Sequence, residues 1–382
     1  MAEYDAIATG GGLAGAAFAR ELARGGARVA IVERTSGPQL KVCGDFLSIE
    51  AQQLLRHLGV DIARLGASRI ETLRLVTGGA SATAPLPFAA AGLSRLRLDE
   101  TLLAAAAGAG AELIRGEAVT ALEPGEGGAT VRIGRRALRT GIVGLATGKH
   151  NLRGWPRKQT GPTAYKMSYA LAPSAADSLS GVVQLLSYPG GYVGACLIEN
   201  GLATICWLAD RSMMKTVGAD WPDHIRYFSS QSARFGDLMS GARPLSARPA
   251  AVSSIPFGYV RRADVPDMIY PLGDQIAVIP SFTGDGTSLA LSSGIVAARA
   301  VLAGQSARTY QRDFLAGIRR QFMFAGVADL AFANRITRKL SVGAVAAAPR
   351  LATLIARLTR LRDVESVVTP VSSSLYNSSS TK

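Results

Sequence analysis

The glycine-rich segment near the amino terminus constrains the fold of this chain more than any other feature. Residues 5–34 read as a strand, a glycine turn, a helix and a second strand. Gly10, Gly12 and Gly15 match the pattern GxGxxG, in which glycines allow a tight turn, approach of the backbone to a pyrophosphate and close helix packing. Glu33 ends the second strand, where a carboxylate binds a ribose diol and disfavours a 2′-phosphate. The segment predicts a βαβ unit that binds an adenine dinucleotide, NAD or FAD.

Size and composition fit two domains that share an interface. The chain has 382 residues, of which 48% are hydrophobic and 18% charged, which excludes a lone small module and a disordered chain. Its formal net charge is +14, and 35 of its 42 basic residues are arginines. Such an excess of arginine suits recognition of phosphate groups.

The cysteines and the amino terminus indicate a reducing compartment. The three cysteines, Cys43, Cys196 and Cys206, are scattered and lack CxxC spacing, so neither a disulfide framework nor a metal site is predicted. We find no recognisable signal segment and no uncharged apolar run long enough to span a bilayer. A cytoplasmic protein is expected.

Two later segments are candidates for a second contact with the dinucleotide. Residues 94–113 predict an arginine-bearing turn followed by an alanine-rich helix. Residues 269–304 predict a strand that ends at Gly273 and Asp274, a loop rich in Gly, Pro and Ser, and a helix that begins near Gly286.

With these motifs in this order, residues 4–305 resemble one superfamily of FAD-dependent oxidoreductases. It unites the aromatic hydroxylases, which are group A flavoprotein monooxygenases, with the geranylgeranyl reductases and the flavin-dependent halogenases. The resemblance implies an α/β fold with a Rossmann-like FAD-binding domain of the glutathione-reductase type, similar to that of the aromatic hydroxylases. It also implies an antiparallel β-sheet substrate domain, a helical C-terminal region and non-covalently bound FAD.

The resemblance implies roles for particular residues. Gly273 and Asp274 would hold the ribityl chain, Arg95 a phosphate, and the loop 280–286 the pyrimidine edge of the flavin, toward which the next helix points its positive end. Cys43 is either a residue beside the flavin or an ordinary buried thiol. The residues expected to bind FAD are Gly10, Gly12, Leu13, Ala14, Gly15, Glu33, Arg34, Cys43, Gly44, Arg95, Gly148, Gly273, Asp274, Gly284, Asp285, Gly286 and Thr287.

No catalytic acid or base is assigned. Candidates near the flavin are Cys43, Pro280, Thr283 and Asp285. The resemblance divides the chain into an FAD-binding domain, a substrate-binding sheet domain, a basic helical cap and a tail expected to be disordered. The FAD-binding domain would comprise residues 1–72, 94–153 and 265–307, and the substrate-binding sheet domain residues 73–93 and 154–264. The basic helical cap would comprise residues 308–363, and the tail residues 364–382.

Two features depart from the family patterns. Hydroxylases usually carry an Asp-Gly pair where this chain has Thr147 and Gly148, so direct reduction by NADH or NADPH becomes doubtful. The nearby Lys149, His150 and Arg153 either contact a nicotinamide donor or an anionic substrate, or form a solvated basic turn. Halogenases carry a Trp-x-Trp-x-Ile-Pro motif, whereas Trp155, Trp207 and Trp221 lie far apart and nothing indicates a buried lysine, which disfavours halogenation.

The middle of the chain predicts an antiparallel sheet. Short apolar runs separated by turns occupy residues 181–186, 191–198, 203–208 and 252–257, with a further strand near 70–88. One alternating set either lines a substrate cavity or forms ordinary sheet core: Tyr165, Lys166, Met167, Tyr169, Tyr192, Cys196 and Trp207. The abundance of apolar side chains indicates a hydrophobic or aromatic substrate.

Residues 308–362 hold most of the positive charge. Leu351, Leu354, Ile355, Leu358 and Leu361 recur at helical spacing with arginines between them. We expect this basic amphipathic helix either to lie on an anionic membrane surface, to cap the cavity, or to pack on the FAD domain. No motif for nucleic acid accompanies the charge.

Monooxygenation is the favoured reaction, in which reduced flavin traps O₂ as a C4a-hydroperoxide and hydroxylates an aromatic or polyketide-like ring, a class suggested by analogy with secondary metabolism. NADH, NADPH or a separate reductase would supply electrons. Flavin-dependent reduction of an isoprenoid C=C bond, as in the geranylgeranyl reductases, and a non-catalytic lipid carrier are the alternatives. The oligomeric state is left open.

Overall fold

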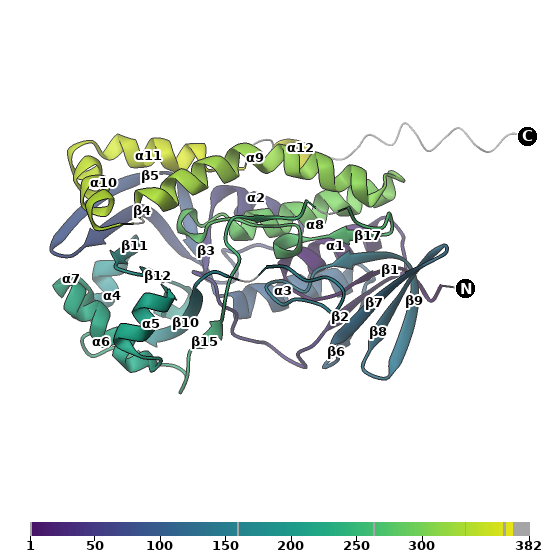
Figure 1. The fold of residues 1–382 in the computed structure, drawn as a ribbon, viewed down its shortest axis with the longest axis horizontal. Helices are drawn as coiled ribbons and strands as arrows, with labels where there is room; N and C mark the ends of the chain where they lie inside the picture. The colour runs from purple at the N-terminus through teal and green to yellow at the C-terminus, as the bar shows by residue number, and fades with distance from the viewer. Residues whose placement is uncertain (1, 159, 263, 333, 362–363, 370–382) are drawn as a thin grey trace, which may run out of the picture.

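Two large β-sheets lie at opposite ends of the long axis of the molecule, and a layer of C-terminal helices runs across both (Figure 1). The computed structural model describes residues 2–158, 160–262, 264–332, 334–361 and 364–369. Within them the expected α/β fold class is confirmed.

The first sheet is built around the predicted βαβ unit. Its strands run in the order β6-β2-β1-β9-β8-β7, and β17 also pairs with β9. Strands β6, β2, β1, β9 and β17 pair in parallel, whereas β7, β8 and β9 form antiparallel hairpins. The strands are β1 Tyr4–Ala8, β2 Val29–Glu33, β6 Glu112–Arg115, β7 Val119–Gly125, β8 Gly128–Ile133, β9 Arg136–Leu145 and β17 Ile269–Pro271.

Helices cover one face of this sheet and form the main core with it. Helix α1 (Leu13–Arg24) packs on β1 and β2, flanked by α3 (Arg95–Gly108) and α8 (Gly286–Leu302), with α2 (Ile49–His57) also against α8. The starts of α2 and α3 follow from their N-cap serines, whose hydroxyls accept a hydrogen bond from the helix backbone.

The second sheet forms the wall of the predicted substrate region. Its order is β14-β10-β13-β12-β11-β4-β5-β3, with β15 also on β10, and only β4 and β11 pair in parallel. The strands are β3 Phe46–Leu47, β4 Ser68–Thr77, β5 Ala80–Gly92, β10 Thr163–Ala170, β11 Gly181–Tyr188, β12 Gly191–Leu197, β13 Ala203–Ala209, β14 Arg243–Pro244 and β15 Ala250–Val252. A two-stranded pair, β16 (Tyr259–Val260) with β18 (Ala277–Val278), lies apart from both sheets.

Two helical layers cover the second sheet. One contains α4 (Pro173–Leu179), α5 (Arg211–Val217), α6 (Trp221–Gln231) and α7 (Ala233–Met239). The other contains α10 (Arg335–Ala347) and α11 (Pro349–Leu358), which pack on β5 after the long helix α9 (Ala307–Ala331) has crossed the molecule (Figure 1).

Most of the expected elements are confirmed, and two are corrected. The runs at 181–186, 191–198 and 203–208 are β11, β12 and β13. The run at 252–257 leaves the sheet after Val252 because Ser254 adopts a left-handed φ of +55°. The tail expected to be disordered from residue 364 begins instead with helix α12 (Val364–Val368), which packs on α2 and α8 because its valines are apolar; residues 370–382 lie outside the described part. The domain boundaries stay a prediction, although β4 begins at Ser68, within the segment expected for the FAD domain.

Candidate functional site

The glycine-rich turn leaves the amino end of α1 open toward two cations. A Cβ atom on Gly15 would lie 2.0 Å from the backbone oxygen of Gly10, so only glycine lets this turn pack on its own helix. A Cβ atom on Gly12, the N-cap of α1, would meet nothing closer than Arg95 Nη2 at 3.9 Å and Lys41 Nζ at 4.0 Å. Free amide groups at a helix start beside two cations form a place that suits an anionic diphosphate.

A buried carboxylate holds these two cations in position. Arg95 Nε and Nη2 lie 2.6 and 2.9 Å from the two carboxylate oxygens of Asp99, and Lys41 Nζ lies 2.8 Å from Asp99 Oδ2. Burial acts to raise the pKa of Asp99, but Arg95 and Lys41 outweigh it and hold the pKa below its usual range. Asp99 therefore holds both cations beside the start of α1.

Glu33 lies at the other side of the turn, at the end of β2. Its Oε2 accepts a hydrogen bond from the Gly11 amide at 2.8 Å, and its Oε1 accepts from the amide and hydroxyl of Thr35 at 3.1 and 2.9 Å. Burial raises its pKa, but Lys41 and these hydrogen bonds lower it by more, so Glu33 is ionised at neutral pH. Together with Thr35 it lines a small second cavity next to Asp99.

Gly273 and Asp274 form a short turn after β17. Asp274 Oδ2 lies 3.0 Å from Lys149 Nζ, and its backbone oxygen accepts a hydrogen bond from Arg157 Nη1 at 2.6 Å. Arg157 is buried and also donates to the backbone oxygen of Gly148. The two turns that the sequence placed far apart, at 147–148 and 273–274, are thus tied together.

Thr147, the residue that replaces the acid of the hydroxylase pattern, uses its hydroxyl group to help hold these two turns together. It accepts a hydrogen bond at 2.7 Å from the buried side chain of Gln275. Beside it, burial and the neighbouring charges of Arg34, Arg157 and Lys149 lower the pKa of His150. His150 is therefore neutral at pH 7 and adds no charge to this basic turn.

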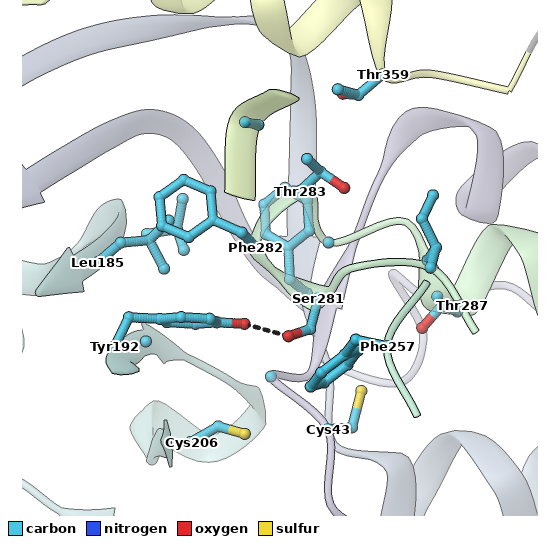
Figure 2. Close-up of a pocket in the computed structure, with 18 of the residues that line it drawn as sticks. Cys43, Leu185, Tyr192, Cys206, Phe257, Ser281, Phe282, Thr283, Thr287 and Thr359 are labelled. Carbon is cyan, nitrogen blue, oxygen red and sulfur yellow. Dashed lines mark hydrogen bonds between the residues drawn. The ribbon is translucent and has the colours of Figure 1, made fainter. Parts of the chain in front are cut away.

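The loop before α8 is held from two sides at the centre of the cavity (Figure 2). The Tyr192 hydroxyl on β12 donates a hydrogen bond to Ser281 Oγ at 2.6 Å, and the Phe282 ring stacks on Phe332 at the end of α9, with centroids 4.4 Å apart. Gly284 has φ +73°, and a Cβ atom there would lie 2.7 Å from the Phe46 ring. A glycine is therefore required for the turn that leads into α8.

Asp285 does not face the cavity but lies beneath the loop, paired with the cap. Its side chain is fully buried, and its Oδ1 lies 3.1 Å from Arg360 Nη1, whose side chain is 10% exposed. Arg360 also donates to the backbone oxygen of Thr283 at 2.7 Å. Burial raises the pKa of Asp285 to about 6, although Arg360 acts to lower it. Arg360, two residues after the end of α11, therefore ties the cap to the loop at the start of α8.

A single cavity of about 560 Å³ joins these parts. It extends from Gly12 and Arg95, past the loop 281–284, to the second sheet and the helices α10 and α11. The pairing of the strands places one set of side chains on the same face, and these form the apolar wall: Leu73, Leu75, Val183, Leu185, Tyr192, Gly194, Cys196 and Cys206.

The prediction that the alternating set lines the cavity is corrected in part, because several of its members lie on the opposite face of the second sheet. Met167 and Tyr169 of β10 pack with the helices α4 to α7, and Tyr165 stacks on Trp207. Trp207 also borders the cavity. Only Tyr192, Cys196 and Trp207 of that set line the cavity, because helices cover both faces of the sheet and alternation alone does not say which face carries the site.

A buried lysine, which the sequence did not indicate, extends from the same face of the second sheet as Cys206 but is not part of the cavity lining. Lys166 on β10 and Asp45 are both fully buried and form a close ion pair. Asp45 also accepts hydrogen bonds from the Thr204 hydroxyl and the Arg95 amide. Lys166 does not line the cavity, so its ammonium group stabilises the turn at Asp45 rather than facing a substrate.

The three cysteines, which are scattered in the sequence, gather on one side of the cavity. Cys43, Cys196 and Cys206 all line it, and Figure 2 shows Cys43 and Cys206 below the Tyr192 ring. Burial raises the pKa of Cys206 to about 12 and also raises that of Cys196. Both are neutral thiols at physiological pH, and within the described residues no group of His, Cys, Asp and Glu suits a metal ion.

The cavity collects most of the residues expected to bind FAD. Gly10 and Gly15 shape the turn, Glu33 lines the second cavity, and Arg34, Pro280 and Asp285 lie outside the main cavity. Those that line the main cavity are Gly12, Leu13, Ala14, Cys43, Gly44, Arg95, Gly148, Gly273, Asp274, Gly284, Gly286 and Thr287, together with the candidate Thr283.

Comparisons with known proteins agree with this geometry. Residues 3–141 match a family model described as an FAD binding domain. The chain has the fold of the FAD-dependent oxidoreductases. Similar solved structures include the flavin-dependent brominase Bmp2 (TM-score 0.77, 19% identity, 93% of each chain covered) and the halogenase PltM in complex with phloroglucinol and FAD (0.75, 15%, 96% of this chain and 85% of that one). A third is the myxobacterial chondrochloren halogenase CndH (0.74, 16%, 94% and 91%). No match in sequence was found among curated proteins.

The pairing of three residues in this fold was not predicted from the sequence. Lys41 stands two residues before Cys43 in a segment already singled out, so its charge was a usable signal. Lys166 occupies an apolar strand, where a lone lysine indicates a buried partner. Arg360 had no such signal, because its partner Asp285 lies in a distant element.

Proposed function

We propose that this chain binds FAD and acts as a monooxygenase on a hydrophobic small molecule. The observation that carries the proposal is the continuity of the cavity: the amino end of α1, with its cations, and the apolar wall of the second sheet belong to one space. A cofactor held at one end would meet a substrate held at the other.

The residues present fit FAD. Gly12 leaves room for a diphosphate beside Arg95 and Lys41, and Glu33 is an ionised acceptor for ribose hydroxyls. Asp274, at the far side of α1, would accept hydrogen bonds from the ribityl hydroxyls in place of its pair with Lys149. When bound and reduced, FAD supplies two electrons to O₂, so that one oxygen atom enters the substrate and the other leaves as water.

The chain itself would position and enclose the substrate. The wall formed by Leu73, Leu185 and their neighbours offers apolar contact, while the loop 281–284 is fixed from above and below by Phe332 and Tyr192. A rigid, apolar space excludes water and holds a ring in one orientation. The start of α8 adds its positive end beside the loop, which suits an anionic reduced cofactor.

Halogenation is a second candidate, favoured by the fold shared with Bmp2, PltM and CndH. It would need a halide and a group that carries the halogen to the substrate. Among the described residues, Lys149 is the lysine that lines the cavity, and it lies beside Asp274, in the part assigned to the ribityl chain of FAD. We therefore rank oxygenation first.

The test has two steps, beginning with the cofactor. Purified protein is titrated with FAD, and binding is followed by quenching of flavin fluorescence. Arg95→Ala should weaken binding at least about tenfold, because a charged hydrogen bond to phosphate is lost, whereas Arg97→Ala, an exposed arginine on the same helix, should not. Equal affinity for FAD in both variants would contradict the assignment of the diphosphate site.

The second step separates the reactions. The FAD-loaded protein is reduced with NADH, NADPH or dithionite and mixed with candidate aromatic and polyketide-like ligands, with ¹⁸O₂, and with or without bromide. Mass spectrometry that finds ¹⁸O in the product supports oxygenation, and a bromide-dependent product without it supports halogenation. Anaerobic reduction of a C=C bond would establish the reductase alternative, and a protein that takes up no FAD would indicate a carrier.

A further inference from the structure

The C-terminal helices carry an exposed apolar surface that the proposed function does not use. On α9 the side chains of Met323, Val327 and Leu330 are 57%, 59% and 69% exposed, and on α10 those of Ile336 and Leu340 are 72% and 66% exposed. These residues recur at spacings of three and four, so each helix presents a continuous stripe to the outside.

The surface continues onto α11. Leu351, Leu354 and Ile355 are 41%, 51% and 39% exposed. Helices α9, α10 and α11 pack on one another and form one layer of the molecule (Figure 1), with their buried sides toward the second sheet and the loop before α8. We call this set, from Met323 to Ile355, the apolar face.

Basic side chains surround the apolar face. Between residues 319 and 361 the chain has eight Arg and Lys residues and one acidic residue, Asp329. Six of the eight are exposed: Arg319, Arg320, Arg335, Lys339, Arg350 and Arg357. Apolar side chains at the centre with cations among and around them match the surface of an anionic bilayer, where acyl chains lie below a layer of negative headgroups.

The mouth of the cavity lies within this face. Leu340, Leu351 and Ile355 line the cavity and are also exposed to solvent, which indicates that the cavity opens among them. Deeper along the same side, Val345 and Ala352 are buried and line the cavity too. The route from the opening to the loop 281–284 is therefore apolar.

We propose that the apolar face docks on an anionic membrane surface and that the substrate enters the cavity from the bilayer. The second part rests on the proposed function and narrows its substrate to a lipophilic molecule that partitions into membranes. Among the described helices no single one is long and apolar enough to span a bilayer, and α10 and α11, which pass such a test only together, are bent by 109°. The attachment is peripheral, with these helices lying in the interface.

The experiment measures co-flotation of the full-length protein with vesicles, with no need for turnover. Vesicles of phosphatidylcholine with phosphatidylglycerol should capture the protein, and capture should fall as salt is raised and when phosphatidylglycerol is left out. The double variant Leu330→Glu, Ile336→Glu should lower the partition coefficient at least about tenfold, because two apolar contacts with the acyl region are lost. Both residues are exposed and lie outside the cavity lining, so the substitutions disturb no packing.

The matched control is Leu245→Glu, a leucine 52% exposed outside these helices, which should float as the unsubstituted protein does. Arg335→Glu with Lys339→Glu should weaken capture by the anionic vesicles, and Arg135→Glu should not. Absence of capture, or capture equally strong for the double variant, overturns the proposal. A self-association that the double variant abolishes, without vesicle capture, would assign the face to a second copy of the chain instead.

The docking proposal and the proposed function can be refuted independently of each other. A protein that floats with vesicles but oxidises nothing refutes the proposed function and leaves the docking surface standing. A protein that oxidises soluble aromatic ligands but does not float refutes the docking alone.

Discussion

Replacing Arg360 by methionine tests the pair that joins the C-terminal cap to the loop before α8. Arg360 Nη1 lies 3.1 Å from Asp285 Oδ1, and both side chains are buried. Methionine keeps much of the volume and removes the charge. Asp285 then lacks its cation, with Thr283, Gln321 and Glu50 as the remaining groups beside it.

The expected loss depends on pH, and its sign follows from the pKa of Asp285. Burial raises this pKa from 3.8 to about 6, so the folded protein binds the proton more tightly and stability falls as pH rises between these values. Arg360 opposes that rise, so without it the pKa moves above 6 and stability continues to fall at higher pH. Each pH unit is worth about 1.4 kcal/mol, so at about pH 8 the variant should lose up to roughly 3 kcal/mol relative to the original protein. That agrees with about 3–5 kcal/mol for one partner removed from a buried ion pair.

The assay is urea unfolding of the FAD-saturated protein, followed by tryptophan fluorescence, at about pH 5 and about pH 8. At the lower pH Asp285 is protonated in both proteins, so only the smaller, pH-independent loss of the hydrogen bond to Thr283 and of the contact with the Phe88 ring should remain. Adding Asp285→Asn to the variant removes the titrating group and should abolish the pH-dependent part.

A loss of the same size at both pH values would refute this reasoning. So would a double variant that keeps the pH dependence, since another group would then be responsible for it.

Three further changes test the site. Gly15→Ala should abolish FAD binding and destabilise the protein, because its Cβ would lie 2.0 Å from a backbone oxygen, whereas Gly37→Ala, where no atom lies within 4 Å, should leave both unchanged in a thermal-shift assay. Tyr192→Phe should cost about 1 kcal/mol, through the lost hydrogen bond to Ser281, and increase proteolysis of the loop; unchanged cleavage would argue against this anchor. Cys206, whose pKa is raised to about 12, should resist alkylation at pH 8 in the folded protein and react after unfolding, as peptide mass spectrometry would report; rapid labelling of the folded protein would contradict the raised pKa.

The part of the site that could be predicted is local in sequence. Gly10, Gly12 and Gly15 describe a turn whose atoms come from one short segment, and Glu33 follows at the end of the next strand, so spacing alone places them together. Strands β11, β12 and β13 were likewise visible as short apolar runs between turns.

The part that could not be predicted depends on which surfaces meet. The alternation of β10 showed two faces but not that Met167 and Tyr169 turn toward α4 to α7 while Lys166 turns toward Asp45. Lysine side chains are usually exposed to solvent. The burial of Lys166 is explained by the carboxylate of Asp45, which lies in a turn far away in the sequence.

The sequence by itself determined the βαβ unit, the order of the dinucleotide motifs and the basic character of the C-terminal helices, because backbone geometry and side-chain period act over a few residues. The tertiary structure alone decided that Arg360 reaches Asp285, that three distant cysteines share one cavity wall, and that the cavity opens among exposed leucines. These are contacts between elements far apart in the chain, set by the packing of the two sheets and the cap as a whole, and no local pattern encodes them.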